Sequence, residues 1–316
     1  MTAAFVFPGQ GSQAVGMGKA LAQAHSAARL VFEEVDDALG ERLSALVWEG
    51  PPDRLILTEN AQPGLMAVSL AVVRVLEREA GLDLARDAAF VAGHSLGEYA
   101  ALAAAGSLAV ADTARLLRIR GLAMQKAVPV GSGAMAAILG LERDTVEAVA
   151  AEAAQGQVCE VANDNGGGQV VVSGDKVAVE RAVEIAKGSG AKRAMMLPVS
   201  APFHCALMRP AAKAMAQALG AVSLRRPVSP LVANVTASAI VDPPDIARRL
   251  VEQVTATVRW RESVAYMAAR GVTRFYEIGA GKVLSGLNRR IAEGASATAI
   301  GTPEDIAAFK ARVAEG

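Results

Sequence analysis

Residues 93–97 read Gly-His-Ser-Leu-Gly and place Ser95 in the pattern G-x-S-x-G. An apolar run, 88–92, precedes this pattern, and a segment rich in helix-forming residues, 98–105, follows it. A serine on such a strand-to-helix turn is typically a nucleophile, because the sharp turn projects its hydroxyl at the start of the helix. There the backbone N–H of Leu96 would stabilise an oxyanion. Ser95 is therefore the candidate nucleophile.

A serine nucleophile needs a base, and the chain contains only three histidines. We expect His25, in the polar part of an amphipathic helix, to be a solvated surface residue. His94 is adjacent to Ser95, so its side chain should leave the turn on another side and serve a structural or substrate-lining role. His204 remains, on a loop that follows an inserted subdomain, and we expect it to be the general base.

The acid that would complete a catalytic triad is not obvious. An α/β-hydrolase places an Asp or Glu between the serine and the histidine, on the large domain. Three candidates, Asp144, Asp164 and Asp175, all fall in the inserted subdomain. A dyad, in which the histidine is oriented by something other than a carboxylate, is therefore a second hypothesis.

Arg120 lies on the apolar face of an expected helix, 111–126. Its neighbours at three- and four-residue spacings are apolar: Leu116, Leu117, Ala123 and Met124. Arg115 and Arg118 lie on more polar sides of the same helix. A buried arginine must be paired, and its fork of donors suits a carboxylate. Two interpretations remain open, a structural salt bridge and a site for a substrate carboxylate.

The loop 9–14 satisfies the loose G-x-G-x-x-A form of a dinucleotide-binding turn, so a nicotinamide-binding protein is the alternative from another class. Pro8 and the two glutamines make an unusual phosphate turn, and the acidic residues Glu33 and Glu34 fall within an expected helix. The segment 279–283 lacks the first glycine and the final Ser or Thr of a P-loop, which argues against nucleoside triphosphate binding.

Short apolar runs alternate with helical segments along the chain. Strands are predicted at 3–7, 88–92 and 274–278, and helices at 17–39, 98–105 and 282–292. This order predicts an α/β fold, with a hydrolase-like large domain built on a mainly parallel sheet. The segment 225–245, which carries four prolines, is expected to be irregular.

The pattern changes between residues 133 and 197. Strands are predicted at 134–139, 158–162, 169–173 and 191–197, and helices at 142–154 and 176–187. The order βαββαβ is the ferredoxin-like plan. We therefore predict a large domain of residues 1–130 and 198–316 and an inserted ferredoxin-like subdomain of residues 131–197. A ligand cleft is expected where the two meet.

Composition limits the class of protein. Of the 316 residues, 52% are hydrophobic and 20% charged, and 32 basic residues balance 32 acidic ones, so the basic footprint of a nucleic-acid binder is missing. Two cysteines, Cys159 and Cys205, are too few for a disulfide framework or a four-ligand zinc site. We expect a cytoplasmic protein with no metal site, no export signal and no transmembrane helix.

Several motifs together resemble the malonyl-CoA:acyl carrier protein transacylase family, the acyltransferases of fatty acid and polyketide synthesis. The residues that carry the resemblance are 7–13, 93–99, Arg120 with Met124-Gln125, Phe203-His204 and 276–279. It covers nearly the whole chain, and the family also contains an inserted βαββαβ unit.

The resemblance implies a role for each matching residue: Ser95 as nucleophile, His204 as general base, Arg120 as the group that binds the malonyl carboxylate, and Gln10 with the Leu96 N–H as oxyanion hole. It further implies that the backbone carbonyl of Gln253 orients the histidine, that Asn163 lines the substrate site, and that Phe203 leaves little room for an α-methyl branch.

The implied reaction is transfer of malonyl from malonyl-CoA to the phosphopantetheine thiol of acyl carrier protein, through a malonyl-serine ester, with no cofactor. The implied partners are acyl carrier protein and malonyl-CoA, with no nucleic acid and no membrane, and a monomer is compatible with them. A serine esterase or thioesterase would use the same serine turn but would not need Arg120. Fatty acid synthesis, a polyketide pathway and a malonate decarboxylase complex all remain open.

Overall fold

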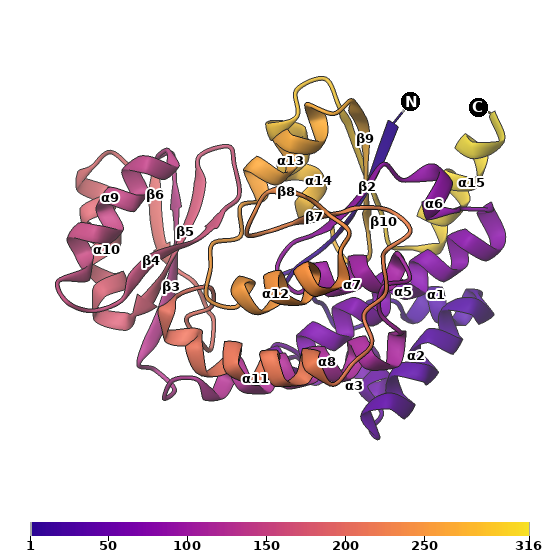
Figure 1. The fold of residues 1–316 in the computed structure, drawn as a ribbon, viewed down its shortest axis with the longest axis horizontal. Helices are drawn as coiled ribbons and strands as arrows, with labels where there is room; N and C mark the ends of the chain where they lie inside the picture. The colour runs from indigo at the N-terminus through magenta and orange to yellow at the C-terminus, as the bar shows by residue number, and fades with distance from the viewer. Residues whose placement is uncertain (1, 316) are drawn as a thin grey trace.

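A computed structural model describes residues 2–315 and contains two β-sheets in separate parts of the molecule (Figure 1). The strands of the larger sheet are β1 (Thr2–Phe7), β2 (Phe90–Gly93), β7 (Leu231–Ala233), β8 (Ser238–Ile240), β9 (Val272–Ile278) and β10 (Ser296–Ile300). Their order is β10-β9-β1-β2-β7-β8, and all neighbours run parallel except β7 and β8, which are antiparallel. The predicted α/β fold with a mainly parallel sheet is confirmed.

Both faces of the larger sheet are buried, as is usual for a parallel sheet. Alternate residues of β1 point to opposite faces: Phe5 and Phe7 belong to one apolar cluster, and Ala4 and Val6 to another. Helices α5 (Thr58–Ala80) and α7 (Gly97–Ala104) pack on the first face, and α13 (Trp260–Ala268) and α14 (Val283–Ile291) on the second. The central strands are thereby held rigidly, and the serine turn lies at the end of one of them.

This part of the molecule contains further helices. They are α1 (Lys19–Ala24), α2 (Ser26–Leu39), α3 (Leu43–Glu49), α4 (Pro52–Leu55), α6 (Leu84–Asp87), α8 (Val110–Lys126), α11 (Arg209–Gly220), α12 (Pro243–Gln253), α15 (Pro303–Glu315) and the 3-10 turn η1 (Ala206–Met208). Helix α8 packs against α5, α2 and α11, below the sheet in Figure 1. It carries Arg120 toward the serine turn.

The smaller sheet is antiparallel and lies at the left of Figure 1. It consists of β3 (Gly133–Leu139), β4 (Cys159–Asp164), β5 (Gln169–Asp175) and β6 (Arg193–Met196) in the order β4-β5-β3-β6, with helices α9 (Arg143–Ala154) and α10 (Lys176–Gly188) on its outer face. This is the predicted ferredoxin-like arrangement. Its inner face, with Met135, Ala137 and Val171, joins the main apolar cluster that also holds Phe203. The domain boundaries at 131 and 197 stay a prediction.

Two expectations from the sequence are wrong. The helix expected over 17–39 is broken at His25, whose backbone is extended between α1 and α2. The His25 side chain is partly exposed, and its Nδ1 lies 2.7 Å from a carboxylate oxygen of Glu79. The segment 225–245 is not irregular throughout, because it contains β7, β8 and the start of α12. The short run Leu231–Ala233 is bounded by polar and proline residues, and its pairing with β2 and β8 makes it a strand.

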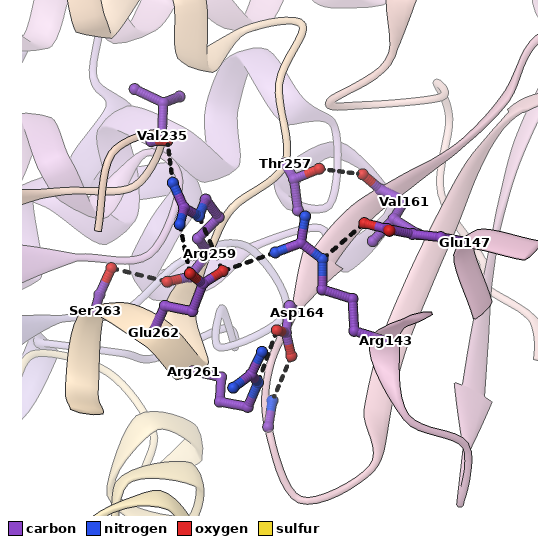
Figure 2. A network of polar contacts seen from close by, with 11 residues as sticks. Arg143, Glu147, Val161, Asp164, Val235, Thr257, Arg259, Arg261, Glu262 and Ser263 are labelled. Atoms are coloured by element: carbon purple, nitrogen blue, oxygen red, sulfur yellow. Dashed lines mark hydrogen bonds and ion pairs between the residues drawn. The ribbon is translucent and has the colours of Figure 1, made fainter. Parts of the chain in front are cut away.

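Polar contacts join the two parts of the molecule (Figure 2). Arg143 of α9 donates to Glu262 of α13 at 2.7 Å, and Arg261 donates to Asp164 of β4 at 2.8 Å. Arg259 binds Glu262 and also donates to the backbone oxygen of Val235 at 3.1 Å. The position of the smaller sheet is therefore tied to the segment that follows Gln253.

Candidate active site

Ser95 lies between the end of β2 and the start of α7, and its backbone is left-handed with φ 53°. The turn is tightly closed. A Cβ at Gly93 would lie 1.9 Å from the carbonyl carbon of Gly97, and a Cβ at Gly97 would lie 2.3 Å from the backbone oxygen of Phe7. Only glycine fits at both positions. A left-handed serine costs about 1–3 kcal/mol and persists only where its surroundings hold it.

The structure brings Ser95 and His204 together. The Ser95 Oγ lies 2.8 Å from the His204 Nε2, and the His204 Nδ1 lies 2.9 Å from the backbone oxygen of Gln253. Because a carbonyl oxygen can only accept, Nδ1 carries the proton of the neutral ring and Nε2 is free to accept one from the serine hydroxyl. This pair can act as a nucleophile and its base, oriented by a carbonyl in place of an acid.

The protonation state of His204 follows from its surroundings. The side chain is 4% exposed. Burial and, to a lesser extent, the positive charge of Arg120 lower the pKa of His204 to about 3, while the hydrogen bond to Gln253 acts in the opposite direction. The ring is therefore neutral at physiological pH, as a general base must be.

Arg120 lies beside this pair and is 1% exposed. Its two terminal nitrogens donate to the side-chain oxygens of Gln62 at 2.8 Å and Gln253 at 2.7 Å, and one of them lies 3.2 Å from the Ser95 Oγ. Within residues 2–315 no carboxylate forms an ion pair with it, and its Nε has no hydrogen-bond partner. The structural salt bridge weighed from the sequence is not formed. A buried guanidinium that lacks an acid can bind one from a ligand.

The backbone N–H of Leu96, directly after the serine, and that of Gln10, on a loop that packs on the serine turn beside His94, are candidates to stabilise an oxyanion. Among the described residues, neither the N–H of Leu96 nor that of Gln10 has a hydrogen-bond acceptor. The side-chain oxygen of Gln10 accepts from the Thr58 hydroxyl at 2.9 Å, and this hydroxyl accepts from Gln62 at 2.8 Å. The chain of contacts fixes the loop that carries Gln10 and, through Gln62, the position of Arg120.

The other residues expected at the site lie around this centre. Phe203 precedes His204 and packs in the main core at 8% exposure, and Asn163 lies in β4, where it bridges to Val258. In the described part of the chain, Asn163 forms no hydrogen bond with Ser95 or His204. His94 is turned away from Ser95: its Nε2 lies 2.9 Å from the side-chain oxygen of Asn165, and burial lowers its pKa.

Three polar residues at the site were not anticipated from the sequence: Gln62, Glu98 and Asn234. Glu98 is 1% exposed and accepts from the backbone N–H of Asn234 at 2.8 Å and from the side chain of Gln253. Asn234 directly follows β7, and a polar residue at the carboxyl end of a parallel strand is a signal for a site. The signal could not be used because 225–245 was expected to be irregular.

No cluster of His, Cys, Asp and Glu that could hold a metal occurs among residues 2–315. In the same residues, no helix combines the length and apolar character needed to cross a membrane.

Comparisons with known proteins agree over nearly the full length. Residues 4–308 match the family model "acyl transferase domain". The chain is 47% identical over 305 residues to a malonyl CoA-acyl carrier protein transacylase of Escherichia coli, covering 96% of this chain and 97% of the relative.

Solved structures give the same result. An acyl-carrier-protein-S-malonyltransferase from Bartonella henselae is 57% identical, with a TM-score of 0.97 and coverage of 99% of this chain and 100% of that one. A malonyl-transacylase in complex with a type II PKS acyl-carrier protein is 42% identical, with a TM-score of 0.95 over 99% and 100% of the two chains. The chain therefore belongs to the acyl transferase domain family.

Proposed function

We propose that this protein transfers malonyl from malonyl-CoA to the phosphopantetheine thiol of acyl carrier protein, through an ester on Ser95, in fatty acid synthesis. Relatives that match this chain over nearly its whole length carry this activity in their names. One solved neighbour is a malonyl-transacylase in complex with an acyl-carrier protein.

In the first half-reaction the Ser95 Oγ attacks the thioester carbonyl while the His204 Nε2 takes its proton. The new oxyanion faces the N–H groups of Leu96 and Gln10. The carbon–sulfur bond then breaks, and the proton passes from His204 to the departing CoA thiolate. In the second half-reaction His204 takes the proton of the carrier thiol, whose sulfur bonds to the ester carbonyl carbon. The carbon–oxygen bond to Ser95 then breaks, and His204 returns the proton to the Ser95 oxygen.

The position of Arg120 is the single observation that supports malonyl as the acyl group that is transferred. A guanidinium buried 3.2 Å from the nucleophile, held by two glutamines and not by an acid, is placed to bind the free carboxylate of malonyl while the other end of the group reaches Ser95. A plain esterase or thioesterase acting on uncharged acyl groups has no use for this buried charge. Phe203 and Asn163 are proposed to line the acyl site.

The nicotinamide-binding alternative has little support. The helix after β1 begins only at Lys19, so no helix N-terminus meets the loop 9–14 as a dinucleotide phosphate requires. The loop instead packs on the serine turn, because a Cβ at Gly9 would lie 2.7 Å from the backbone oxygen of His94.

The proposed steps use only groups of this chain, with malonyl-CoA as a substrate, and we propose that no cofactor takes part. A cytoplasmic location is part of the proposal. It is supported by Cys159 and Cys205, which are both buried free thiols and suit a reducing compartment.

The test is incubation of the protein with malonyl-CoA alone, followed by intact mass and peptide mapping. We expect one malonyl group on the peptide that contains Ser95, no label in Ser95→Ala, and full label in Ser107→Ala, whose hydroxyl donates to the Arg225 backbone oxygen. Adding holo acyl carrier protein should move the label to the carrier, whereas the apo carrier, which has no thiol, should leave it on the enzyme. Label on another residue, or none, would refute the proposal.

A further inference from the structure

Asn234 contacts two backbone groups of the serine turn, one on each side of His94. Its side-chain oxygen accepts from the backbone N–H of Ser95 at 2.8 Å, and its side-chain nitrogen donates to the backbone oxygen of Gly93 at 2.8 Å. The residue is 0% exposed. One amide therefore satisfies the two backbone groups that flank His94, directly before the nucleophile.

These contacts continue the β2–β7 pairing beyond the point where the two backbones separate. The parallel register pairs Val91 with Leu231 and Ala92 with Val232 and then ends. The next residue of β2, Gly93, pairs with Phe7 of β1 but no longer with β7, and the backbone of Ser95 is already left-handed. Beyond this point the Asn234 side chain makes the hydrogen bonds that continued pairing with β7 would otherwise make.

Asn234 is itself fixed at both backbone groups. Its N–H donates to Glu98 at 2.8 Å, and its carbonyl accepts from the N–H of Arg259 at 3.1 Å. Arg259 is bound in turn to Glu262 and Val235, in the network that Figure 2 shows. All four polar groups of Asn234 are thus in use, so its amide cannot turn away from Ser95 without breaking buried hydrogen bonds.

We propose that Asn234 is a positioning residue for the nucleophile. It holds the left-handed backbone at Ser95, so that the hydroxyl lies 2.8 Å from the His204 Nε2 and the N–H of Leu96 stays unpaired for the oxyanion. The inference rests on one part of the proposed function, namely that Ser95 is the nucleophile.

Acyl selection should not depend on Asn234. Arg120 is held by Gln62 and Gln253 and has no hydrogen bond to Asn234. Asn234 reaches Gln253 only by a long contact of 3.5 Å to its side-chain nitrogen, which also donates to the Ser95 backbone oxygen at 2.9 Å and to Glu98. Loss of Asn234 should therefore slow the acylation of Ser95 while leaving the half-saturating concentration of malonyl-CoA and the preference for malonyl over acetyl unchanged. A purely structural role would lower stability without this separation.

The test compares Asn234→Ala with a matched control, Asn288→Ala. Asn288, on α14, is also 0% exposed and accepts from the Trp260 indole N–H at 3.1 Å, and among the described residues it forms no hydrogen bond with the serine turn. The readouts are the single-turnover rate of Ser95 acylation, its dependence on malonyl-CoA concentration, and Tm. We expect Asn234→Ala to lose roughly ten- to a hundredfold in rate, as for a small misplacement of reacting groups, with half-saturation unchanged. The Tm of Asn288→Ala should fall, whereas its rate of Ser95 acylation should equal that of the wild type.

A second variant tests the proposal in case Asn234→Ala does not fold. Asn234→Asp has the same shape and keeps an acceptor for the Ser95 N–H, but its carboxylate cannot donate to Gly93. We expect a rate between those of the wild type and Asn234→Ala. A folded Asn234→Ala or Asn234→Asp that acylates at the wild-type rate would overturn the proposal, as would equal losses of rate in Asn234→Ala and Asn288→Ala.

A substrate-independent probe separates this inference from the proposed function. A fluorophosphonate reacts as the Ser95 oxygen bonds to phosphorus, fluoride leaves, and His204 takes the hydroxyl proton. If the wild type ignored malonyl-CoA but bound the phosphonate at Ser95, the proposed function would fail alone. The slower phosphonylation expected of Asn234→Ala would still support the positioning role, and an unchanged rate would refute it.

Discussion

Ser95 and His204 face each other across 2.8 Å, and both have left-handed backbones, with φ 53° and φ 60°. Neither is a glycine, so each conformation must be stabilised by its surroundings. Asn234 holds the backbone of Ser95, and the carbonyl of Gln253 holds the ring of His204. The close approach of the pair is thus imposed by residues from two other segments of the chain, which is the usual sign of a preorganised reaction centre.

The assignment of the base predicts opposite results for two histidine variants. His204→Ala removes the ring that lies 2.8 Å from the Ser95 Oγ, so malonyl transfer should fall by on the order of a hundredfold to ten-thousandfold. His94→Ala removes a ring bonded to Asn165 and should lower Tm while keeping most of the transfer rate. Steady-state transfer to acyl carrier protein and thermal melts of both variants check this. A dead His94→Ala beside an active His204→Ala would exchange the two roles.

The pH dependence of kcat/KM reports the ionisation of the base in the free enzyme. Burial, helped by the charge of Arg120, lowers the pKa of His204 to about 3. Its neutral form, which accepts the serine proton, is therefore present at every pH well above 3. We expect kcat/KM for malonyl-CoA to be flat between about pH 5 and pH 8, measured by single-turnover acylation. An acid limb centred near the ordinary histidine pKa of about 6.5 would contradict this.

Glu98 predicts a pH dependence of stability. Burial raises its pKa from 4.5 to about 8, against the hydrogen bonds from Asn234 and Gln253 and the charge of Arg120. Between these two values the folded state binds more protons than the unfolded state, so this group makes the free energy of unfolding fall as pH rises. Glu98→Gln removes the titration. Relative to this variant, the Tm of the wild type should fall progressively from pH 5 to pH 8. If plots of Tm against pH for the two proteins ran parallel, the Glu98 carboxylate would be ionised throughout this range, and the prediction would be wrong.

The sequence was sufficient where chemistry depends on residue type within one segment. The glycines around Ser95 indicated the turn, and the apolar stripe around Arg120 indicated a buried charge. It was not sufficient for Glu98 and Asn234, because their roles arise only when β7 pairs with β2 and brings distant segments together. Three residues of strand carry too little pattern to be distinguished from a loop, so a polar residue at the end of that strand could not be placed.

Replacement of Arg120 tests the choice of acyl group. If Arg120 pairs with the malonyl carboxylate, Arg120→Ala leaves that charge buried and unpaired, and kcat/KM for malonyl-CoA should fall by roughly a hundredfold or more. Acetyl-CoA has no free carboxylate, so its kcat/KM should hold or rise, and the preference for malonyl should be lost. Arg120→Lys should recover little, because an ammonium cannot reproduce the fork that spans Gln62, Gln253 and a carboxylate.

Arg118→Ala is the matched control for this variant. Arg118 is on the same helix and donates to the side chain of Asn60 at 2.7 Å and to Glu41, away from Ser95. Loss of the Arg118 side chain should lower Tm and leave the ratio of malonyl to acetyl kcat/KM unchanged. If Arg120 served only to hold the fold together, Arg120→Ala would resemble this control, with a lower Tm and equal losses for both substrates. A folded Arg120→Ala with the wild-type ratio would remove Arg120 from the acyl site, whereas a collapsed ratio at modest cost in Tm would locate the selection of malonyl in this one side chain.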